Sequence, residues 1–353
     1  MSGPQDSALP GPLEAAKTAL QKKHGLRYDA EWLKIASQAV PPEGTVPAKK
    51  EWKDVFELRA FTESLLGALF KIPPYPEQVQ ETKVELDSPD GTHSFTVSRF
   101  ATAEQRAPPK EGEPLRSAVL NIHGGGMICC TVEIFAPEIA RHVAAQGVQH
   151  FAVDYVRAPE YPAPAAVNDC YTALEWLSAH AREMHIDPER IIVFGDSAGG
   201  GIAAGTVLMA RDKGLHPPVA KQILVYPMLD DRTHYPDDWP MRSFVTWKAE
   251  DNVMGWNAYV GADKRGKEDA DVSHYAAPAR AKSLEGLPST YIDVGGLDLF
   301  RDEDIRYAQR LAEANVEVEF HLYPGVPHGF EGAQGTWVAT KAVENRIKAI
   351  QGV

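Results

Sequence analysis

The chain has 353 residues, which is long enough for one large α/β domain or two medium domains with a sizeable buried core. Its hydrophobic content of 44% and charged content of 24% fit a globular protein, and its net charge of -13 argues against nucleic acids and anionic membranes as partners, because both attract clustered Lys and Arg. Residues 1–12 do not resemble a secretory signal, no run is apolar enough for a membrane span, and three cysteines make no disulfide framework, so we expect a cytoplasmic protein.

The first predicted elements are helical. Apolar residues recur at helical spacing in residues 13–20 and again in 55–70, with a Pro-Pro-Glu-Gly turn at 41–44 between them. The proline-rich residues 73–76 then form an extended linker, because a residue that precedes proline disfavours the helical conformation. We therefore predict two parts, residues 1–76 as a helical segment with its linker and residues 77–353 as the main domain.

From residue 79 onward, strands begin and then alternate with helices. The predicted strands are 82–86, 95–100, 118–122, 151–155, 191–194, 223–226, 290–294 and 318–322. Helices are predicted at 131–146, 165–181, 199–213 and 335–350. This alternation predicts an α/β fold with a mostly parallel central sheet flanked by helices, in which the first two strands pair antiparallel because no helix separates them.

One long segment interrupts the alternation. More than sixty residues, rich in Trp, Tyr, Met and Asp, separate the strands 223–226 and 290–294. Such a length is too great for a simple loop in a compact domain. We predict a helical insertion at about 230–275, which forms a lid over the carboxyl ends of the strands together with the N-terminal helices.

The most informative motif is Gly195-Asp196-Ser197-Ala198-Gly199, between the strand 191–194 and a helix of small residues. A G-x-S-x-G sequence between a strand and a helix is typical of a sharp turn that holds its serine in a strained conformation. The glycines two positions before and after Ser197 leave room for the crossing backbone. Ser197 is therefore a candidate nucleophile.

A second motif, His123-Gly124-Gly125-Gly126, directly follows the strand 118–122. Glycines allow backbone N–H groups to point at the oxygen that becomes negative in a tetrahedral intermediate, and the N–H of Ala198 adds a donor from a second loop. Alone, three glycines could form a flexible turn. After a buried strand, and about seventy residues before Ser197, they predict an oxyanion loop that His123 holds by hydrogen bonding.

A serine hydroxyl needs a base within hydrogen-bond reach, and twelve histidines compete for that role. His328 is favoured because it lies in a turn-rich segment, 324–330, directly after the last predicted strand. This position is at the carboxyl edge of the sheet, where open α/β folds carry their sites. Histidines in predicted helices, such as His142 and His180, are expected at the solvated surface.

The third member of such a site is a carboxylate that orients the imidazole. The chain order Ser, acid, His points to Asp298, in the loop after the strand 290–294. Asp293 lies within that strand, so it is expected to be too far from the carboxyl edge of the sheet to reach the site. Asp302, Glu303 and Asp304 are expected to be charges at the N-terminus of the next helix.

These motifs, in this order, resemble the hormone-sensitive-lipase-like carboxylesterases, the H-G-G-G group of the α/β-hydrolase superfamily. The resemblance covers residues 118–330 and includes the stretches 154–160 and 275–278. It implies an α/β-hydrolase fold with a helical cap, built from residues 1–76 and the insertion, on a catalytic domain of residues 77–353. It also implies a triad of Ser197, Asp298 and His328 and an oxyanion hole of Gly125, Gly126 and Ala198.

Two residues depart from the family pattern. Met127 stands where the family commonly has an aromatic residue, and Gly296 stands where it commonly has Glu. The first departure bears on the acyl pocket, and the second bears on the support of the loop around Asp298. The side chains expected to line the substrate pocket are Met127, Trp247, Met254 and Trp256.

Motifs and resemblance together predict a serine carboxylester hydrolase that acts on short- to medium-chain acyl esters through an acyl-enzyme. No metal or organic cofactor is expected, and the expected partner is a small-molecule ester. Two alternatives stay open: an acyl transferase or deacetylase of a secondary metabolite on the same triad, and a non-catalytic small-molecule receptor. A monomer and a homodimer are both compatible with the sequence.

Overall fold

The computed structural model describes residues 25–39 and 51–353. The predicted helix at 13–20 and the turn at 41–44 lie outside the described residues. The N-terminal helices that the structure describes are α2 (Ala30–Ala39) and α3 (Val55–Leu69). The second matches the predicted helix 55–70, and Asp54 caps it by accepting hydrogen bonds from the N–H groups of Phe56 and Glu57.

In the described part of the chain, eight strands form one sheet in the order β1-β2-β4-β3-β5-β6-β7-β8. The strands are β1 (Val79–Asp87), β2 (Ser94–Thr102), β3 (Arg116–Ile122), β4 (Gln149–Asp154), β5 (Ile186–Asp196), β6 (Lys221–Val225), β7 (Ser289–Gly295) and β8 (Val318–Tyr323). β2 pairs antiparallel with β1 and with β4, and every later pair is parallel. The predicted sheet, including its antiparallel start, is confirmed.

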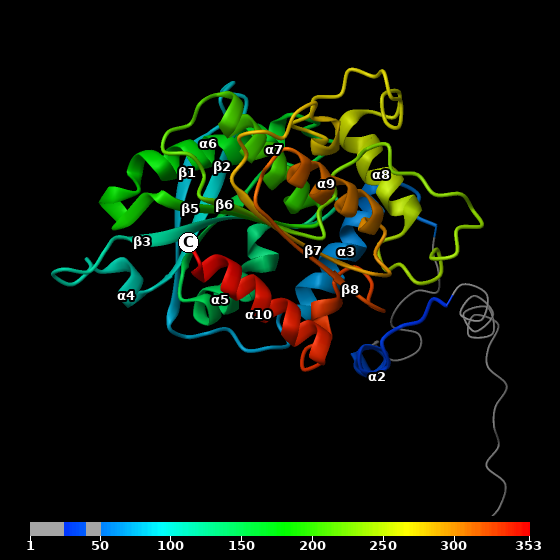
Figure 1. The fold of residues 1–353 in the computed structure, drawn as a ribbon, viewed down its shortest axis with the longest axis horizontal. Coiled ribbons are helices and arrows are strands. Elements are labelled where there is room, and N and C mark those ends of the chain that lie inside the picture. Colours follow the sequence, from blue (N-terminus) through cyan, green and yellow to red (C-terminus); the bar gives the residue numbers. More distant parts are fainter. Residues whose placement is uncertain (1–24, 40–50) are drawn as a thin grey trace, which may run out of the picture.

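Helices cover both faces of this sheet (Figure 1). α5 and α10 lie on one face, and α6, α7 and α9 lie on the other (Figure 1). Besides α2 and α3, the helices are α4 (Ala103–Arg106), α5 (Val132–Gln146), α6 (Ala165–His180), α7 (Ala198–Asp212), α8 (Ala249–Val260), α9 (Arg301–Glu313) and α10 (Trp337–Gln351). Short 3₁₀ turns, η1 (Arg182–Met184), η2 (Pro278–Arg280) and η3 (Phe330–Gly332), complete the described elements.

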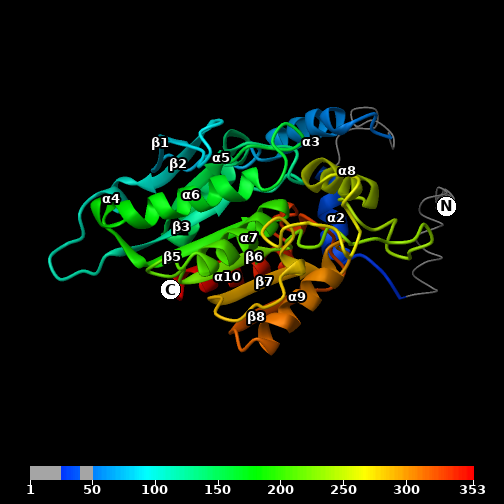
Figure 2. The same cartoon turned by 90° about the horizontal axis from the view of Figure 1, so that it is seen from above.

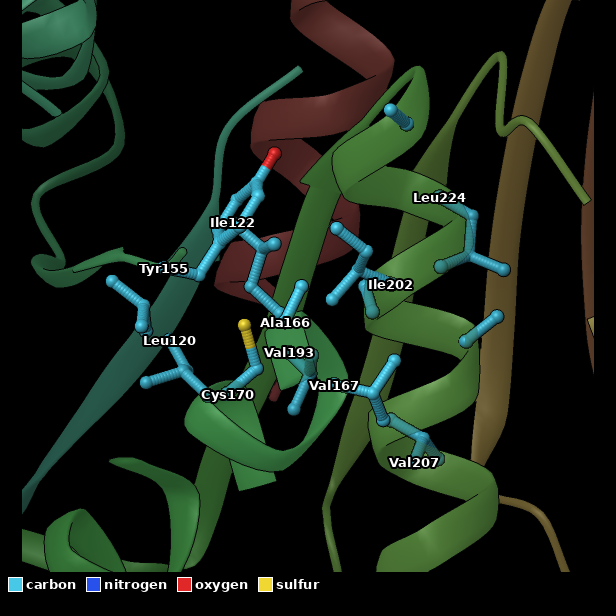
Figure 3. Close-up of a cluster of buried hydrophobic side chains, with 14 of the residues drawn as sticks. Leu120, Ile122, Tyr155, Ala166, Val167, Cys170, Val193, Ile202, Val207 and Leu224 are labelled. Carbon is cyan, nitrogen blue, oxygen red and sulfur yellow. The ribbon is translucent and has the colours of Figure 1, made fainter. Parts of the chain in front are cut away.

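β3 and the second half of β5, residues 191–195, are buried almost throughout and mostly apolar, as expected for parallel strands that are covered on both faces. Figure 3 shows Leu120, Ile122 and Val193 from the strands in one buried cluster with Ile202 and Val207 of α7. α7 itself is made largely of Gly and Ala, and almost all of it is buried. This packing fixes the start of α7, and therefore Ser197, against the carboxyl ends of the strands.

The segment between β6 and β7 is less helical than predicted. Of residues 230–275, only α8 forms a helix, and most of the rest consists of turns and irregular backbone. α8 and α3 lie at the same end of the molecule (Figure 2), and the indole Nε1 of Trp52 donates to Asp251 Oδ1 of α8 at 2.9 Å. Among the described helices, none is long and apolar enough to cross a bilayer.

Candidate active site

Ser197 lies at the sharp turn between β5 and α7, in a conformation that side chains rarely adopt. Its φ of 55° and ψ of -122° lie in a region that is costly for any residue with a Cβ atom. Two backbone hydrogen bonds hold this conformation, from Ser197 N–H to Val225 O at 2.8 Å and from Met228 N–H to Ser197 O at 2.9 Å. The side chain is thereby presented at the carboxyl edge of the sheet, with 8% of the residue exposed.

The glycines on either side of Ser197 are required by close backbone contacts. A Cβ atom on Gly195 would lie 2.2 Å from Gly199 O, and one on Gly199 would lie 2.1 Å from Ile122 O. Neither position can hold a larger residue without moving the backbone. The prediction that these glycines make room for a backbone crossing is confirmed.

The structure brings Ser197, His328 and Asp298 together in one hydrogen-bonded chain. His328 Nε2 lies 2.9 Å from Ser197 Oγ, and His328 Nδ1 lies 2.8 Å from Asp298 Oδ2. Asp298 is fully buried, and its other carboxylate oxygen accepts the N–H of Phe300 at 2.9 Å. An imidazole held in this way carries its proton on Nδ1 and offers Nε2 as an acceptor to the serine hydroxyl.

Charges around His328 favour its protonated form. Burial alone would lower the pKa of His328, but the carboxylates of Asp298, Glu331 and Asp196 together outweigh this effect and raise the pKa above its ordinary value. The aromatic ring of Tyr226 lies against the imidazole, with 4.3 Å between ring centroids. The imidazolium that proton transfer would create therefore has a preformed anionic and aromatic environment.

Behind His328 lies a buried ion network that links η3, β7 and α10. Arg346 binds both carboxylate oxygens of Asp293, at 2.6 and 2.9 Å, and its Nη1 donates to Glu331 Oε1 at 3.2 Å. Glu331 also accepts the hydroxyl of Tyr226. Burial alone would raise the pKa of Glu331, but Arg346, the Tyr226 hydroxyl and His328 together lower it below its ordinary value, which favours the anionic form of Glu331.

The loop of residues 123–126 follows β3 and approaches Ser197; it is here called the glycine loop. Gly125 and Gly126 have φ values of 127° and 60°, which favour glycine. The backbone N–H groups of Gly125, Gly126 and Ala198 donate to no other group among the described residues. His123 Nδ1 lies 2.7 Å from Gly124 O, so the predicted hydrogen bond between His123 and its loop is confirmed.

The four residues predicted to line a pocket occupy different environments. Trp247 covers the glycine loop, since a Cβ atom on Gly126 would lie 2.7 Å from its indole ring. Met127 has 1% of its surface exposed, and Met254 is partly buried against the main core. Trp256 has no exposed surface and belongs to the main hydrophobic core. Met127 belongs to the same core, so burial does not separate Met127 from Trp256, and Trp247 is the predicted side chain that the structure places against the glycine loop.

Two groups of residues differ from expectation. His142 is only partly exposed, and burial of its imidazole lowers its pKa to about 4. Glu303 and Asp304 lie in the first turn of α9 as predicted, but both are buried. Glu303 accepts the N–H of Leu229 at 2.6 Å and the hydroxyl of Thr233, so it anchors the loop after β6. No local sequence signal distinguishes it from a solvated helix-terminal charge.

Asp196, the residue before Ser197, is a further member of the site. Burial raises its pKa to about 7, and the nearby charge of Glu331 adds to the effect. A Cβ atom on Gly124 would lie 2.4 Å from Asp196 Oδ2, so this carboxyl group packs directly against the glycine loop. Asp196 is the variable second residue of the G-x-S-x-G motif, and nothing in the sequence indicated that its carboxyl group is buried.

Comparisons with known proteins agree with this geometry. Residues 119–332 match a protein family described as alpha/beta hydrolase fold. The chain is 35% identical to the esterase LipI of Mycobacterium tuberculosis over 231 residues, which are 65% of this chain and 70% of LipI. A bacterial heroin esterase of known structure is 36% identical, with a TM-score of 0.80 over 92% of this chain and 98% of that one. The gibberellin receptor GID1A of Arabidopsis thaliana is 32% identical over 64% of this chain and 68% of the receptor.

Proposed function

The chain belongs to the alpha/beta hydrolase fold family and is a carboxylesterase of its hormone-sensitive-lipase-like group, and from this premise we propose that Ser197, His328 and Asp298 are its catalytic triad. The observation that carries the proposal is the hydrogen-bonded chain from Ser197 Oγ through His328 to Asp298. The N–H groups of Gly125, Gly126 and Ala198 form the oxyanion hole. Their lack of other partners among the described residues supports this role.

Acylation begins when Ser197 Oγ attacks the ester carbonyl carbon and its proton passes to His328 Nε2. The carbonyl oxygen becomes an oxyanion, which accepts hydrogen bonds from the three N–H groups. Asp298 keeps Nδ1 protonated and stabilises the imidazolium. As the tetrahedral intermediate collapses, the bond to the alcohol oxygen breaks and His328 returns the proton to the leaving alcohol, which leaves an acyl group on Ser197.

Deacylation repeats the same steps with water. His328 Nε2 takes a proton from the water molecule while its oxygen attacks the acyl carbon. A second oxyanion forms in the same hole, the bond to Ser197 Oγ breaks, and the proton returns to the serine. The products are the free acid and the regenerated enzyme.

The substrates we propose are esters with short to medium acyl chains. Trp247 supports this limit because its indole ring lies on the glycine loop and restricts the space beside the oxyanion hole. Met127 and Met254 are the other side chains assigned to the pocket.

The contact between Trp52 and Asp251 supports a cap formed by residues 1–76 and the insertion at 230–275. Three buried free thiols support a cytoplasmic location.

The test is hydrolysis of a series of p-nitrophenyl esters from acetate to palmitate by the full chain. We expect turnover that is highest for short acyl chains and is lost in Ser197→Ala. Trp247→Ala should extend the preference toward longer chains. Wild-type turnover that persists in Ser197→Ala, or no turnover of any ester, would contradict the assignment of the triad.

The two other readings give different results in the same experiments. An acyl transferase would give the acyl group to an added alcohol well beyond the molar share of that alcohol in water, which product analysis measures. A receptor would bind an ester without releasing alcohol. The complete hydrogen-bonded chain of Ser197, His328 and Asp298 favours hydrolysis over a receptor function.

A further inference from the structure

The turn that follows the glycine loop has an unusual backbone. Gly125 and Gly126 are followed by Met127 with a φ of 67° and by Cys130 with a φ of 75°. Residues with a Cβ atom rarely adopt such values, and they persist only where the surroundings fix them. Residues 125–130, here called the oxyanion turn, must therefore be held from outside.

Few of the polar groups of the oxyanion turn are satisfied within it. Gly125 O accepts the N–H groups of Ile128 and Cys129 at 3.1 and 2.9 Å. Met127 O accepts the N–H of Ala158, from the loop after β4, at 3.0 Å. Buried backbone groups need partners, so the carbonyl of Ile128 and the N–H of Cys130 must find theirs in another element.

That element is the helix α3. Arg59 Nε donates to Ile128 O at 2.5 Å, and Glu63 Oε1 accepts the N–H of Cys130 at 2.9 Å. Arg59 and Glu63 are four residues apart, so they lie on the same face of the helix. One face of α3 thus contacts the oxyanion turn at two points.

Both side chains are themselves held in place. The guanidinium of Arg59 binds the two carboxylate oxygens of Glu160 at 2.6 and 2.7 Å, and it donates to Ala158 O at 2.8 Å. Arg157 Nη1 bridges Glu63 Oε1 and Cys130 O, at 2.9 Å each. The Arg59 side chain is 14% exposed and that of Glu160 is 44% exposed, so the Arg59 side of this charge-assisted pair is shielded from solvent and the Glu160 side is not.

We infer that α3 positions the oxyanion turn through Arg59 and Glu63, which act as positioning residues and do not touch the reacting atoms. The inference rests on the proposed function, because it takes Gly125 and Gly126 as donors to the oxyanion. Without the two contacts, the strained turn relaxes and the two N–H groups lose their common direction. Stabilisation of the transition state then falls, while binding of the ground-state ester changes little.

The experiment compares Arg59→Met and Glu63→Ala with the wild type, using Ser64→Ala on the exposed side of the same helix as the control. One measurement is kcat and KM for p-nitrophenyl acetate. The other is the inhibition constant of an aryl trifluoromethyl ketone. In that adduct Ser197 Oγ bonds the carbonyl carbon, its proton passes to His328, and the ketone oxygen becomes an oxyanion in the hole. Arg59→Lys and Glu63→Gln, which keep a donor or acceptor, complete the set.

We expect Arg59→Met and Glu63→Ala each to lower kcat about tenfold to a hundredfold, to weaken ketone binding by the same factor, and to leave KM within about twofold. The Lys and Gln variants should fall between these and the wild type, and Ser64→Ala should equal the wild type. Unchanged kcat, or reduced kcat with unchanged ketone binding, overturns the inference.

If Arg59→Met or Glu63→Ala does not fold, Arg59→Lys and Glu63→Gln decide by the same two measurements. Failure of the proposed function has a different signature, since wild-type activity would then not depend on Ser197. Ser197-dependent activity with unaffected α3 variants would remove only the role of α3.

Discussion

Replacing Gly199 with alanine should damage stability and catalysis together. The added Cβ atom would lie 2.1 Å from Ile122 O and 2.4 Å from His123 O, where ordinary contacts begin at 3.4 Å. The start of α7 and the end of β3 would have to separate by roughly 1 Å or more, and both are backbone in a packed core. Overpacking of this kind costs about 1 to 3 kcal/mol of unfolding free energy.

The same displacement separates the two halves of the proposed oxyanion hole. Ala198 precedes Gly199 on α7, whereas Gly125 and Gly126 follow β3, so a shift between these elements changes the distances among the three donors. A misplacement of about 1 Å can lower kcat by about 10²-fold. We therefore expect Gly199→Ala to lose about two orders of magnitude in kcat for p-nitrophenyl acetate.

The matched control is Gly67→Ala in the interior of α3, where an added Cβ atom meets nothing within 4 Å. This variant should gain about 0.5 to 1 kcal/mol from the better helix propensity of alanine and keep the wild-type kcat. Urea unfolding and steady-state kinetics on the three proteins measure both effects. A Gly199→Ala protein with wild-type unfolding free energy and wild-type kcat would refute the reasoning.

Three further predictions concern the groups around His328. Asp298→Asn should lower kcat by about 10⁴-fold, because an amide favours the wrong imidazole tautomer, and a loss below tenfold in ester kinetics would contradict the role of Asp298. Arg346→Met should lower the unfolding free energy by about 3 to 5 kcal/mol, because Asp293 would stay buried without its cation, and an unchanged urea midpoint would argue against this. His328 must be neutral to act as a base, so kcat/KM falls as the pH falls through its raised pKa. Glu331→Gln removes one of the anions that raise this pKa and should shift the acid limb of the pH profile to lower pH, and a limb that stays in place or moves upward would speak against it.

The sheet and the sharp turn at Ser197 could be predicted because their determinants are local in the sequence. Apolar runs alternate with segments of helical periodicity from residue 118 onward. The close backbone contacts at the turn require glycine at positions 195 and 199, which gives the motif its fixed spacing. Chain order and loop position were enough to select Asp298 and His328 among many acids and histidines. These constraints act over a few residues or on the order of motifs, which a single sequence displays directly.

Contacts between distant segments left no such signal. Arg346 and Asp293 are 53 residues apart, and Glu63 and Cys130 are 67 apart, so each reads as an ordinary charged or apolar residue in its own segment. The insertion shows the same limit, because its backbone is largely irregular and no periodicity indicates which way a side chain points. Trp247 covers the glycine loop, while Trp256, only nine positions later, lies in the core.

At Ser197, with its positive φ, the proposed reaction and the stability of the fold favour different residue types. A glycine at this position would adopt the same φ without steric cost, but it would have no hydroxyl. Loss of the proposed nucleophile is therefore downhill in folding free energy. Natural selection for turnover has to act continuously against a drift toward more stable, inert descendants, and a laboratory selection for thermostability alone should find this position early.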